Sequence, residues 1–166
     1  LKRFNLDQKK QYRKEIRCRY SVEEKDFLIM FVANNFRLKG LRNLIHAAAL
    51  MKREIESGIP FRVFVLGNGK KALYERLAIR LGCWNEFTFI GKTNEIEKFY
   101  AAADVLAQPT FYDPCSLSTL EAMASGLPVI TTTCNGAGEL VKNGVHGFVL
   151  DNPQDCAELS KKLLLF

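Results

Sequence analysis

The stretch Phe27-Leu28-Ile29-Met30-Phe31-Val32 is apolar at every position. A strand with one face in water alternates apolar and polar residues, so an unbroken apolar run of this length predicts a strand buried on both faces. The segment 39–57 follows with apolar residues at the spacing of one helix face: Leu41, Leu44, Ile45, Ala48 and Met51. A doubly buried strand followed by an amphipathic helix is the unit from which parallel sheets are built.

The same alternation continues to the end of the chain. Short apolar runs predict strands at 61–66, 87–90, 104–108, 128–132 and 147–150, and amphipathic segments predict helices at 70–81, 94–102, 116–125 and 153–165. The sequence therefore predicts an α/β fold, a Rossmann-like doubly wound parallel sheet of about six strands with helices on both faces. In such a sheet ligands bind beyond the carboxyl ends of the strands, which directs attention to the loops that leave them.

Length and composition set broad limits on this chain. It has 166 residues, 48% of them hydrophobic and 25% charged, which suits one globular domain and excludes wholesale disorder or a coiled coil. No apolar run approaches the roughly 20 residues of a membrane helix, and the start of the chain lacks the apolar segment of a secretory signal. We therefore expect a soluble, cytoplasmic domain.

The net charge of +6 is unevenly distributed, and the first 26 residues, which we expect to be mostly helical, are rich in cations. Such a cluster suits nucleic acid, anionic lipid or a phosphorylated small molecule, or it solvates a helix face. No interleaving with aromatic residues supports nucleic acid, which we do not expect as a partner. The cluster consists of Lys2, Arg3, Lys9, Lys10, Arg13, Lys14, Arg17 and Arg19.

The cysteines and histidines give no sign of a metal site. Five cysteines are scattered along the chain without a CxxC pair, and the two histidines, His46 and His146, are far apart in sequence. A zinc site of ordinary spacing is therefore unsupported. Scattered cysteines in odd number indicate reduced thiols in a reducing compartment.

Two glycine-containing segments resemble nucleotide-binding motifs only in part. Leu66-Gly67-Asn68-Gly69 lies between an expected strand and an expected helix, but a dinucleotide-binding loop belongs to the first strand of its fold and has an acidic residue about 20 positions on. A close backbone approach to a ligand, or a tight turn, is the better interpretation. Gly91-Lys92-Thr93 resembles the end of a P-loop, but Glu86 stands where that loop needs a glycine.

The most informative stretch is Asp113-Pro114-Cys115-Ser116-Leu117-Ser118-Thr119-Leu120-Glu121. Cys115 or Ser116 caps the expected helix, whose free amides and positive dipole would hold an anion such as a diphosphate. Asp113 in front of that helix and Glu121 along it would accept hydrogen bonds from hydroxyls on either side of the phosphates, which is the layout of a nucleotide sugar. Alternatively, Asp113 and Pro114 form a turn and Glu121 is an ordinary helix charge.

A second candidate lies after the first expected strand, where Arg37 and Lys39 precede a helix. An arginine fork and a lysine point charge at that position suit a phosphate clamp. The alternative is a solvated basic loop.

Together and in this order, these segments resemble the C-terminal half of a retaining GT-B glycosyltransferase of the glycosyltransferase-4, or group 1, family. The resemblance covers nearly the whole chain. Asp113 and Glu121 have the spacing of the two acids of the family's E-x7-E signature, and the stretch 122–130 after them is similar as well. Further similar segments are 37–40, 67–69, 89–91, 100–105 and 144–149. Within the family, the chain is similar to bacterial lipopolysaccharide-core and surface-glycan transferases.

The resemblance implies a role for individual residues. The implied catalytic set is Asp113, which would bind donor-sugar hydroxyls, with Lys39 and Arg37, which would contact the donor diphosphate and stabilise the leaving nucleotide. Glu121 would bind the ribose hydroxyls and Ile90 the base, through its backbone. Other donor-binding positions would be Gly67 and the amides of Cys115, Ser116, Leu117 and Ser118. The resemblance implies neither a metal nor a cofactor beside the nucleotide-sugar substrate.

Four positions depart from the family pattern. Asp113 is one methylene shorter than the usual Glu, which would alter sugar selectivity. Cys115 and Ser116 stand where Phe and Gly are common. Ala33 stands where many relatives carry an Arg, six residues before the loop lysine, so the clamp would rest on Arg37 and Lys39 only.

The resemblance also implies a division of the chain and a role for a missing part. Residues 1–26 would be an interdomain linker with a basic helix, and 27–166 a nucleotide-sugar donor-binding domain whose acceptor-binding N-terminal partner is absent. The parent enzyme would be a retaining hexosyltransferase that moves a hexose from a nucleotide sugar, preferably a UDP-sugar, to a glycan or glycolipid acceptor in lipopolysaccharide or polysaccharide biosynthesis. The basic cluster would coat the linker, the partner domain or the cytoplasmic face of an anionic inner membrane.

Two other classes of function stay open at this point. One is a stand-alone module that binds nucleotide sugars without catalysis. The other is a related GT-B epimerase or phosphorylase, which is disfavoured because no convincing cofactor-anchoring lysine is present.

Overall fold

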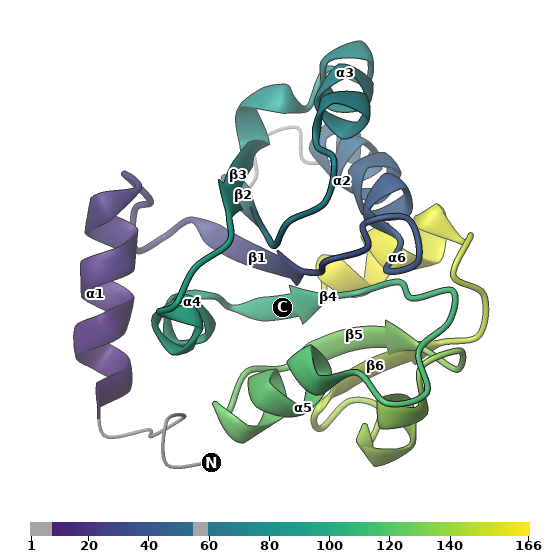
Figure 1. Ribbon diagram of the computed structural model, residues 1–166. Coiled ribbons are helices and arrows are strands. Elements are labelled where there is room, and N and C mark those ends of the chain that lie inside the picture. The colour runs from purple at the N-terminus through teal and green to yellow at the C-terminus, as the bar shows by residue number, and fades with distance from the viewer. Residues whose placement is uncertain (1–7, 55–59) are drawn as a thin grey trace.

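The computed structural model describes residues 8–54 and 60–166. Its centre is a six-stranded sheet in the order β3-β2-β1-β4-β5-β6, and each neighbouring pair of strands is parallel (Figure 1). The predicted doubly wound sheet is thereby confirmed. The strands are β1 (Phe27–Val32), β2 (Phe61–Leu66), β3 (Phe87–Gly91), β4 (Val105–Ala107), β5 (Val129–Thr132) and β6 (Gly147–Leu150).

The helices follow the predicted segments closely. They are α1 (Lys9–Arg19), α2 (Leu41–Glu54), α3 (Ala72–Arg80), α4 (Ile96–Ala102), α5 (Leu117–Ala124) and α6 (Cys156–Leu163). Two short 3₁₀ helices, η2 (Trp84–Glu86) and η3 (Gly136–Leu140), were not predicted. The helix expected from residue 39 begins at Leu41, because Gly40 adopts φ +78° in the preceding turn. The expected C-terminal end of that helix, at 55–57, lies outside the described residues.

Two hydrophobic layers cover the sheet, one on each face. Ile29 and Phe31 of β1 pack into the layer made by α2, α3 and α6. Leu28 and Met30 of the same strand pack into the layer that contains residues of α1, α4 and α5. Each fully buried side chain of this size contributes about 1.5–3 kcal/mol relative to exposure. The unbroken apolar run at 27–32 therefore exists because both faces of the strand are covered.

The strand order reverses at β1, which pairs with β2 on one side and with β4 on the other. Ligands of doubly wound sheets bind in the crevice at such a reversal, beyond the carboxyl ends of the strands. Here the loops that leave β1 and β4 meet, since the Phe111 N–H donates to the Leu38 carbonyl at 2.8 Å. The backbone of Gly40 also approaches the second loop so closely that a Cβ would lie 2.1 Å from the Pro109 carbonyl oxygen.

The N-terminal helix α1 lies beside α4 at the amino ends of the strands (Figure 1). Its Arg17 is buried, with 2% of the residue exposed, and donates to Asp104 Oδ2 at 2.6 Å. Arg13 binds the other carboxylate oxygen of Asp104 at 2.9 Å. The fold therefore uses the charges of these two members of the basic cluster internally. Within 8–54 and 60–166, no helix is long and apolar enough to cross a membrane.

Candidate functional site

Lys39 and Asp113 form an ion pair where the loops after β1 and β4 meet. Their side chains are only 15% and 20% exposed. Asp113 is held by its backbone, because its N–H donates to the Cys134 carbonyl at 3.0 Å and its carbonyl accepts from the Gly136 N–H at 2.9 Å. Burial lowers the pKa of Lys39 to about 8. The structure thus brings together two of the three predicted catalytic residues, which lie 74 positions apart in the chain.

The third predicted catalytic residue, Arg37, lies on the same loop and lines a cavity of about 670 Å³. Arg42, His46 and Tyr74 also line this cavity, whereas Lys39 and Asp113 do not. Joint binding of one phosphate group by Arg37 and Lys39 stays a prediction.

A buried polar network supports the start of α5. Gln108, at the end of β4, donates to the Val32 carbonyl and to Ser118 Oγ, and its own carbonyl oxygen accepts from Ser116 Oγ at 3.1 Å. Ser116 stands at the predicted N-cap, but its hydroxyl binds Gln108 and does not cap the helix. A satisfied network in a protein interior fixes geometry strongly. Gln108 therefore sets where the helix begins.

Asn135 joins the same network from the loop after β5. Only 1% of it is exposed, and its side chain donates to Thr131 Oγ1 at 2.9 Å and to Thr119 Oγ1 at 3.1 Å. Its carbonyl oxygen accepts from the Ser116 N–H at 3.1 Å. This asparagine ties α5 to β5. Sequence reasoning missed both residues, although for Gln108 a polar residue directly after the apolar strand β4 was a usable signal.

The four predicted anion-binding amides fall into two groups. The Cys115 N–H donates to Asp113 Oδ1 at 3.0 Å, and the Ser116 N–H is bound by Asn135. The amides of Leu117 and Ser118 open the first turn of α5, where N–H groups have no partner within the helix. Among the hydrogen bonds of the described residues, these two amides have no acceptor. They are the donors left for an anion.

Glu121 is oriented by a tyrosine from the neighbouring helix. Tyr100 of α4, which is fully buried, donates its hydroxyl to Glu121 Oε2 at 3.0 Å and to the Ser118 carbonyl at 3.3 Å. Burial, followed by the charge of Glu121, raises the pKa of Tyr100, so the phenol stays a donor. Sequence reasoning missed this contact, because Tyr100 was noted only as part of the segment 100–105 that resembles the family.

Gly67 and Ile90 come from the strands on the other side of β1. Gly67 follows β2 with φ +119°, and a Cβ there would lie 1.7 Å from the Ala33 carbonyl oxygen. The sequence suggested either a close approach to a ligand or a tight turn at this glycine. The structure has the tight turn, in which Gly67 lies against the chain's own backbone. Ile90 is half-buried in the edge strand β3 and packs against the α1–α4 face of the sheet.

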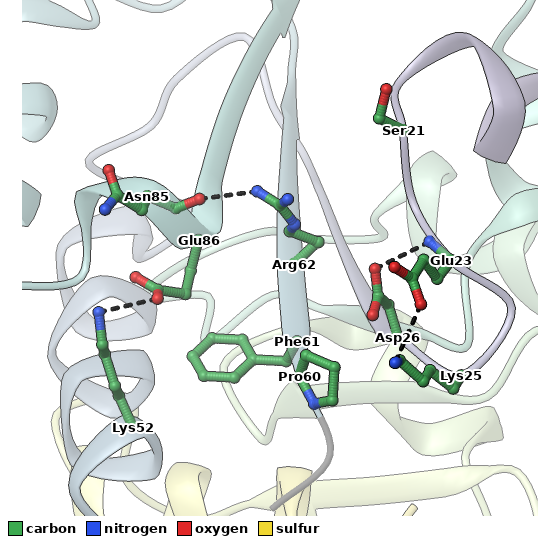
Figure 2. A pocket seen from close by; sticks show the side chains of 10 residues that line it. All are labelled: Ser21, Glu23, Lys25, Asp26, Lys52, Pro60, Phe61, Arg62, Asn85 and Glu86. Atoms are coloured by element: carbon green, nitrogen blue, oxygen red, sulfur yellow. Dashed lines mark hydrogen bonds and ion pairs between the residues drawn. The ribbon is translucent and has the colours of Figure 1, made fainter.

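A further cavity lies at the opposite end of the sheet, around the start of β2 (Figure 2). Its volume is about 460 Å³, and its charged side chains bind one another or the backbone. Lys52 pairs with Glu86 at 2.8 Å, and Arg62 donates to the Asn85 carbonyl at 2.8 Å. The cavity lies away from the carboxyl ends where ligands of this fold bind, so it is the weaker candidate.

Metal ligands do not cluster in the part of the chain that the structure describes. No group of three His, Cys, Asp or Glu residues between 8 and 54 or between 60 and 166 is placed to hold a metal ion. The five cysteines are free thiols.

Comparison with known proteins identifies relatives across nearly the whole chain. Residues 12–166 match the family model described as glycosyl transferases group 1. The lipopolysaccharide glucosyltransferase WaaG of Escherichia coli is 29% identical over 147 residues, which cover 89% of this chain and 39% of WaaG. The D-inositol 3-phosphate glycosyltransferase of Corynebacterium urealyticum is 33% identical over 147 residues, covering 82% and 34%. The chain thus spans less than two-fifths of the length of either relative.

Solved structures agree with this match. The crystal structure of WaaG superposes with a TM-score of 0.82 at 28% identity, over 92% of this chain and 42% of that protein. The structure of HepE from Anabaena in complex with UDP-glucose superposes with a TM-score of 0.81 at 25% identity, over 93% and 42%. Both likenesses correspond to one half of a GT-B fold.

Proposed function

This chain belongs to the glycosyl transferases group 1 family, and from that premise we propose that it is the donor-binding domain of a retaining hexosyltransferase. The observation that carries the proposal is the Lys39–Asp113 pair, set in front of α5 where the strand order reverses. A cation, an acid and two amides without acceptors occupy one edge of the sheet there. This is the set of groups that a sugar linked to a diphosphate requires.

In this proposal the ion pair is exchanged for contacts with the donor. The Lys39 ammonium binds the diphosphate, and the Asp113 carboxylate accepts hydrogen bonds from donor-sugar hydroxyls. The amides of Leu117 and Ser118 add hydrogen bonds and the dipole of α5. When the bond between the sugar and the diphosphate breaks, negative charge develops on the leaving group, and Lys39 is already positioned to stabilise it. Arg37 would contribute its charge from the neighbouring cavity.

The nucleoside would be held on the same edge of the sheet. Glu121, oriented by Tyr100, accepts hydrogen bonds from the ribose hydroxyls. The backbone near Ile90 contacts the base, and Gly67 lines that part of the pocket. The amides of Cys115 and Ser116 act as supports for the loop, because each already has an acceptor within the chain.

The donor proposed is a UDP-hexose, transferred with retention to a glycan or glycolipid acceptor. HepE has been solved with UDP-glucose, and WaaG is a lipopolysaccharide glucosyltransferase. Residues 1–26 would form the linker and basic helix, and 27–166 the donor domain. A second domain would bind the acceptor, and the enzyme would act in the cytoplasm, in contact with an anionic membrane at most peripherally. The alternative is a module that binds nucleotide sugars without catalysis.

Calorimetric titration with UDP, UDP-glucose, GDP and ADP tests the donor site. We expect UDP and UDP-glucose to bind with a Kd of about 1 mM or below, corresponding to about 4 kcal/mol. Lys39→Gln should weaken binding by at least about tenfold, because a hydrogen bond to a charged group contributes about 1.5–3 kcal/mol. Lys52→Gln, at the other end of the sheet, is the matched control. Absence of nucleotide binding at millimolar concentration would contradict the proposal.

The gene that encodes the chain separates the transferase from the binding module. A reading frame that continues upstream with another α/β pattern supports the transferase, whose complete product should transfer hexose with retention. Nucleotide-sugar binding without transfer by the complete gene product would favour the module.

A further inference from the structure

Four arginines surround a groove between α2 and α3, on the face of the sheet away from α1. Arg37 and Arg42 line the cavity of about 670 Å³, and Arg42 also lines an adjoining cavity of about 430 Å³ together with Arg76 and Arg80. We call this the arginine groove. The two cavities share Arg42 and Tyr74, and no described residue that lines them is an aspartate or a glutamate.

These arginines differ from those of α1 in that no acidic residue of the described chain pairs with them. Within 8–54 and 60–166, no ion pair involves Arg37, Arg42, Arg76 or Arg80. Arg13, by contrast, binds both Asp104 and Glu24. Like charges gathered around one groove repel each other, and an anion bound among them would convert that repulsion into attraction.

The wall of the groove includes Tyr74, a packed aromatic residue that offers a hydrogen-bond donor. The Tyr74 ring packs edge-on against Phe36, with ring centres 5.6 Å apart and an interplanar angle of 82°. Burial raises the pKa of Tyr74 and outweighs the opposing charges of Arg37 and Arg42, so its hydroxyl remains protonated at neutral pH. Guanidinium forks match the geometry of phosphate oxygens, which a neutral or cationic ligand would not exploit.

His46 reports the positive field inside the groove. It extends from α2 into the larger cavity, and its pKa is lowered first by burial and then by the charges of Arg42 and Arg80. The imidazole therefore lies within the field of arginines from both α2 and α3. An anion bound beside it would reverse part of this shift.

We propose that the arginine groove binds phosphoryl groups, with Arg42 as the central contact, at a site separate from Lys39 and Asp113. Because two cavities adjoin at Arg42, the ligand would carry two phosphoryl groups or one diphosphate, either free in solution or on the headgroup of a lipid. This site overlaps the proposed donor site only at Arg37 and does not depend on it.

Proton NMR of the imidazoles tests the site directly, because the chain has only two histidines. Inorganic pyrophosphate is titrated into the wild type and into Lys39→Gln, in which the donor site is weakened. We expect the His46 resonances to shift saturably and its pKa to rise in both proteins, while His146 stays unchanged. Equal responses of the two histidines would overturn the proposal. So would the absence of a His46 response if the protein also fails to bind the anionic vesicles described below.

A matched pair of variants on α2 separates a site from general charge. Arg42 and Arg53 are both exposed on α2, but only Arg42 lines the two cavities. Arg42→Gln should therefore weaken pyrophosphate binding by about tenfold or more, whereas Arg53→Gln, with the same change in charge, should alter it by less than about twofold. Arg80→Gln provides a second variant in the smaller cavity. If Arg53→Gln weakens binding as much as Arg42→Gln, the arginine groove is not a site.

Vesicles distinguish the two sources of phosphate. Sedimentation with cardiolipin vesicles, whose headgroup carries two phosphates, that depends on Arg42 and is absent with phosphatidylcholine vesicles identifies a lipid headgroup as the ligand. A His46 response to pyrophosphate without vesicle binding identifies a soluble phosphate compound. Absence of both results overturns the proposal.

Discussion

The two ends of the sheet differ in how their cationic side chains are paired. At the amino end, Arg13 and Arg17 bind Asp104, and Lys52 binds Glu86, so these cations are neutralised within the chain. At the carboxyl end, Lys39 pairs with Asp113 in front of a helix, and the arginine groove beside this pair has no aspartate or glutamate in its described lining. The cations at the amino end are thus paired within the chain, whereas we propose that the charged groups at the carboxyl end bind a ligand. Substitutions at the two ends should therefore have separable effects on stability and on binding.

The largest expected effect is on stability at the amino end. Asp104→Asn removes the counter-charge of Arg17, whose side chain is only 3% exposed, and weakens the bond from the Leu28 N–H. Because loss of one partner leaves a buried charge uncompensated, we expect unfolding to become easier by about 3 kcal/mol. Urea denaturation measures this. Glu24→Gln, which alters the exposed partner of Arg13, is the control and should change stability by less than about 1 kcal/mol. A fall in UDP affinity of folded Asp104→Asn would contradict the separation of the two ends.

The next effect joins stability to binding at the carboxyl end. Asn135→Ala leaves the Ser116 N–H and the Ala137 N–H without their acceptor, at a cost of about 2 kcal/mol in the free energy of unfolding. The start of α5 should also loosen, so UDP affinity should fall in the same variant. Denaturation and calorimetry measure the two effects. The exposed Asn152→Ala is the matched control, and unchanged UDP affinity in Asn135→Ala would show that the network does not support the site.

A smaller effect is expected from pH. Only the ammonium form of Lys39 attracts a diphosphate, and burial lowers its pKa to about 8. The affinity for UDP is therefore highest well below pH 8, where Lys39 is protonated. Above pH 8, binding requires that Lys39 take up a proton. We expect UDP affinity to fall by up to about tenfold between pH 7 and pH 9. Lys39→Arg remains charged throughout this range, so calorimetry should find its affinity nearly independent of pH. Parallel pH profiles for both proteins would argue against Lys39 as the titrating group.

The smallest effect should come from Lys52 at the amino end. Its side chain is 42% exposed, and that of its partner Glu86 is 17% exposed. Water screens the exposed ammonium, and the amide of a glutamine can still donate to Glu86, so Lys52→Gln should change the free energy of unfolding by less than about 1 kcal/mol. UDP affinity should not change. A large loss of stability, measured by urea denaturation, would mean that the cavity of Figure 2 is more important to the fold than its exposure indicates.

The sequence predicted the fold well because periodicity reports burial directly. The apolar run at 27–32 implied two covered faces, and the two hydrophobic layers provide them. It predicted the site less completely, because contacts between distant residues leave no local pattern. No residue near Glu121 in the sequence predicts its hydrogen bond with Tyr100. The basic N-terminal helix resembled a binding surface because its partner, Asp104, lies far along the chain. That Arg37 lines a cavity which Lys39 does not line also required coordinates, since neighbours on a loop can point in different directions.

The glycines of the carboxyl edge have a consequence for how this domain can evolve. Gly67 lies against the backbone of Ala33, and Gly40 lies against that of Pro109. The loop after β2 therefore packs on the loop after β1, which in turn packs on the loop after β4. An insertion or deletion in one of them would displace the next, and through it the groups at Asp113. Change in donor preference is therefore expected to proceed by exchange of side chains on loops of constant length. Lineages that diverge in specificity should retain both glycines while the residues between them vary.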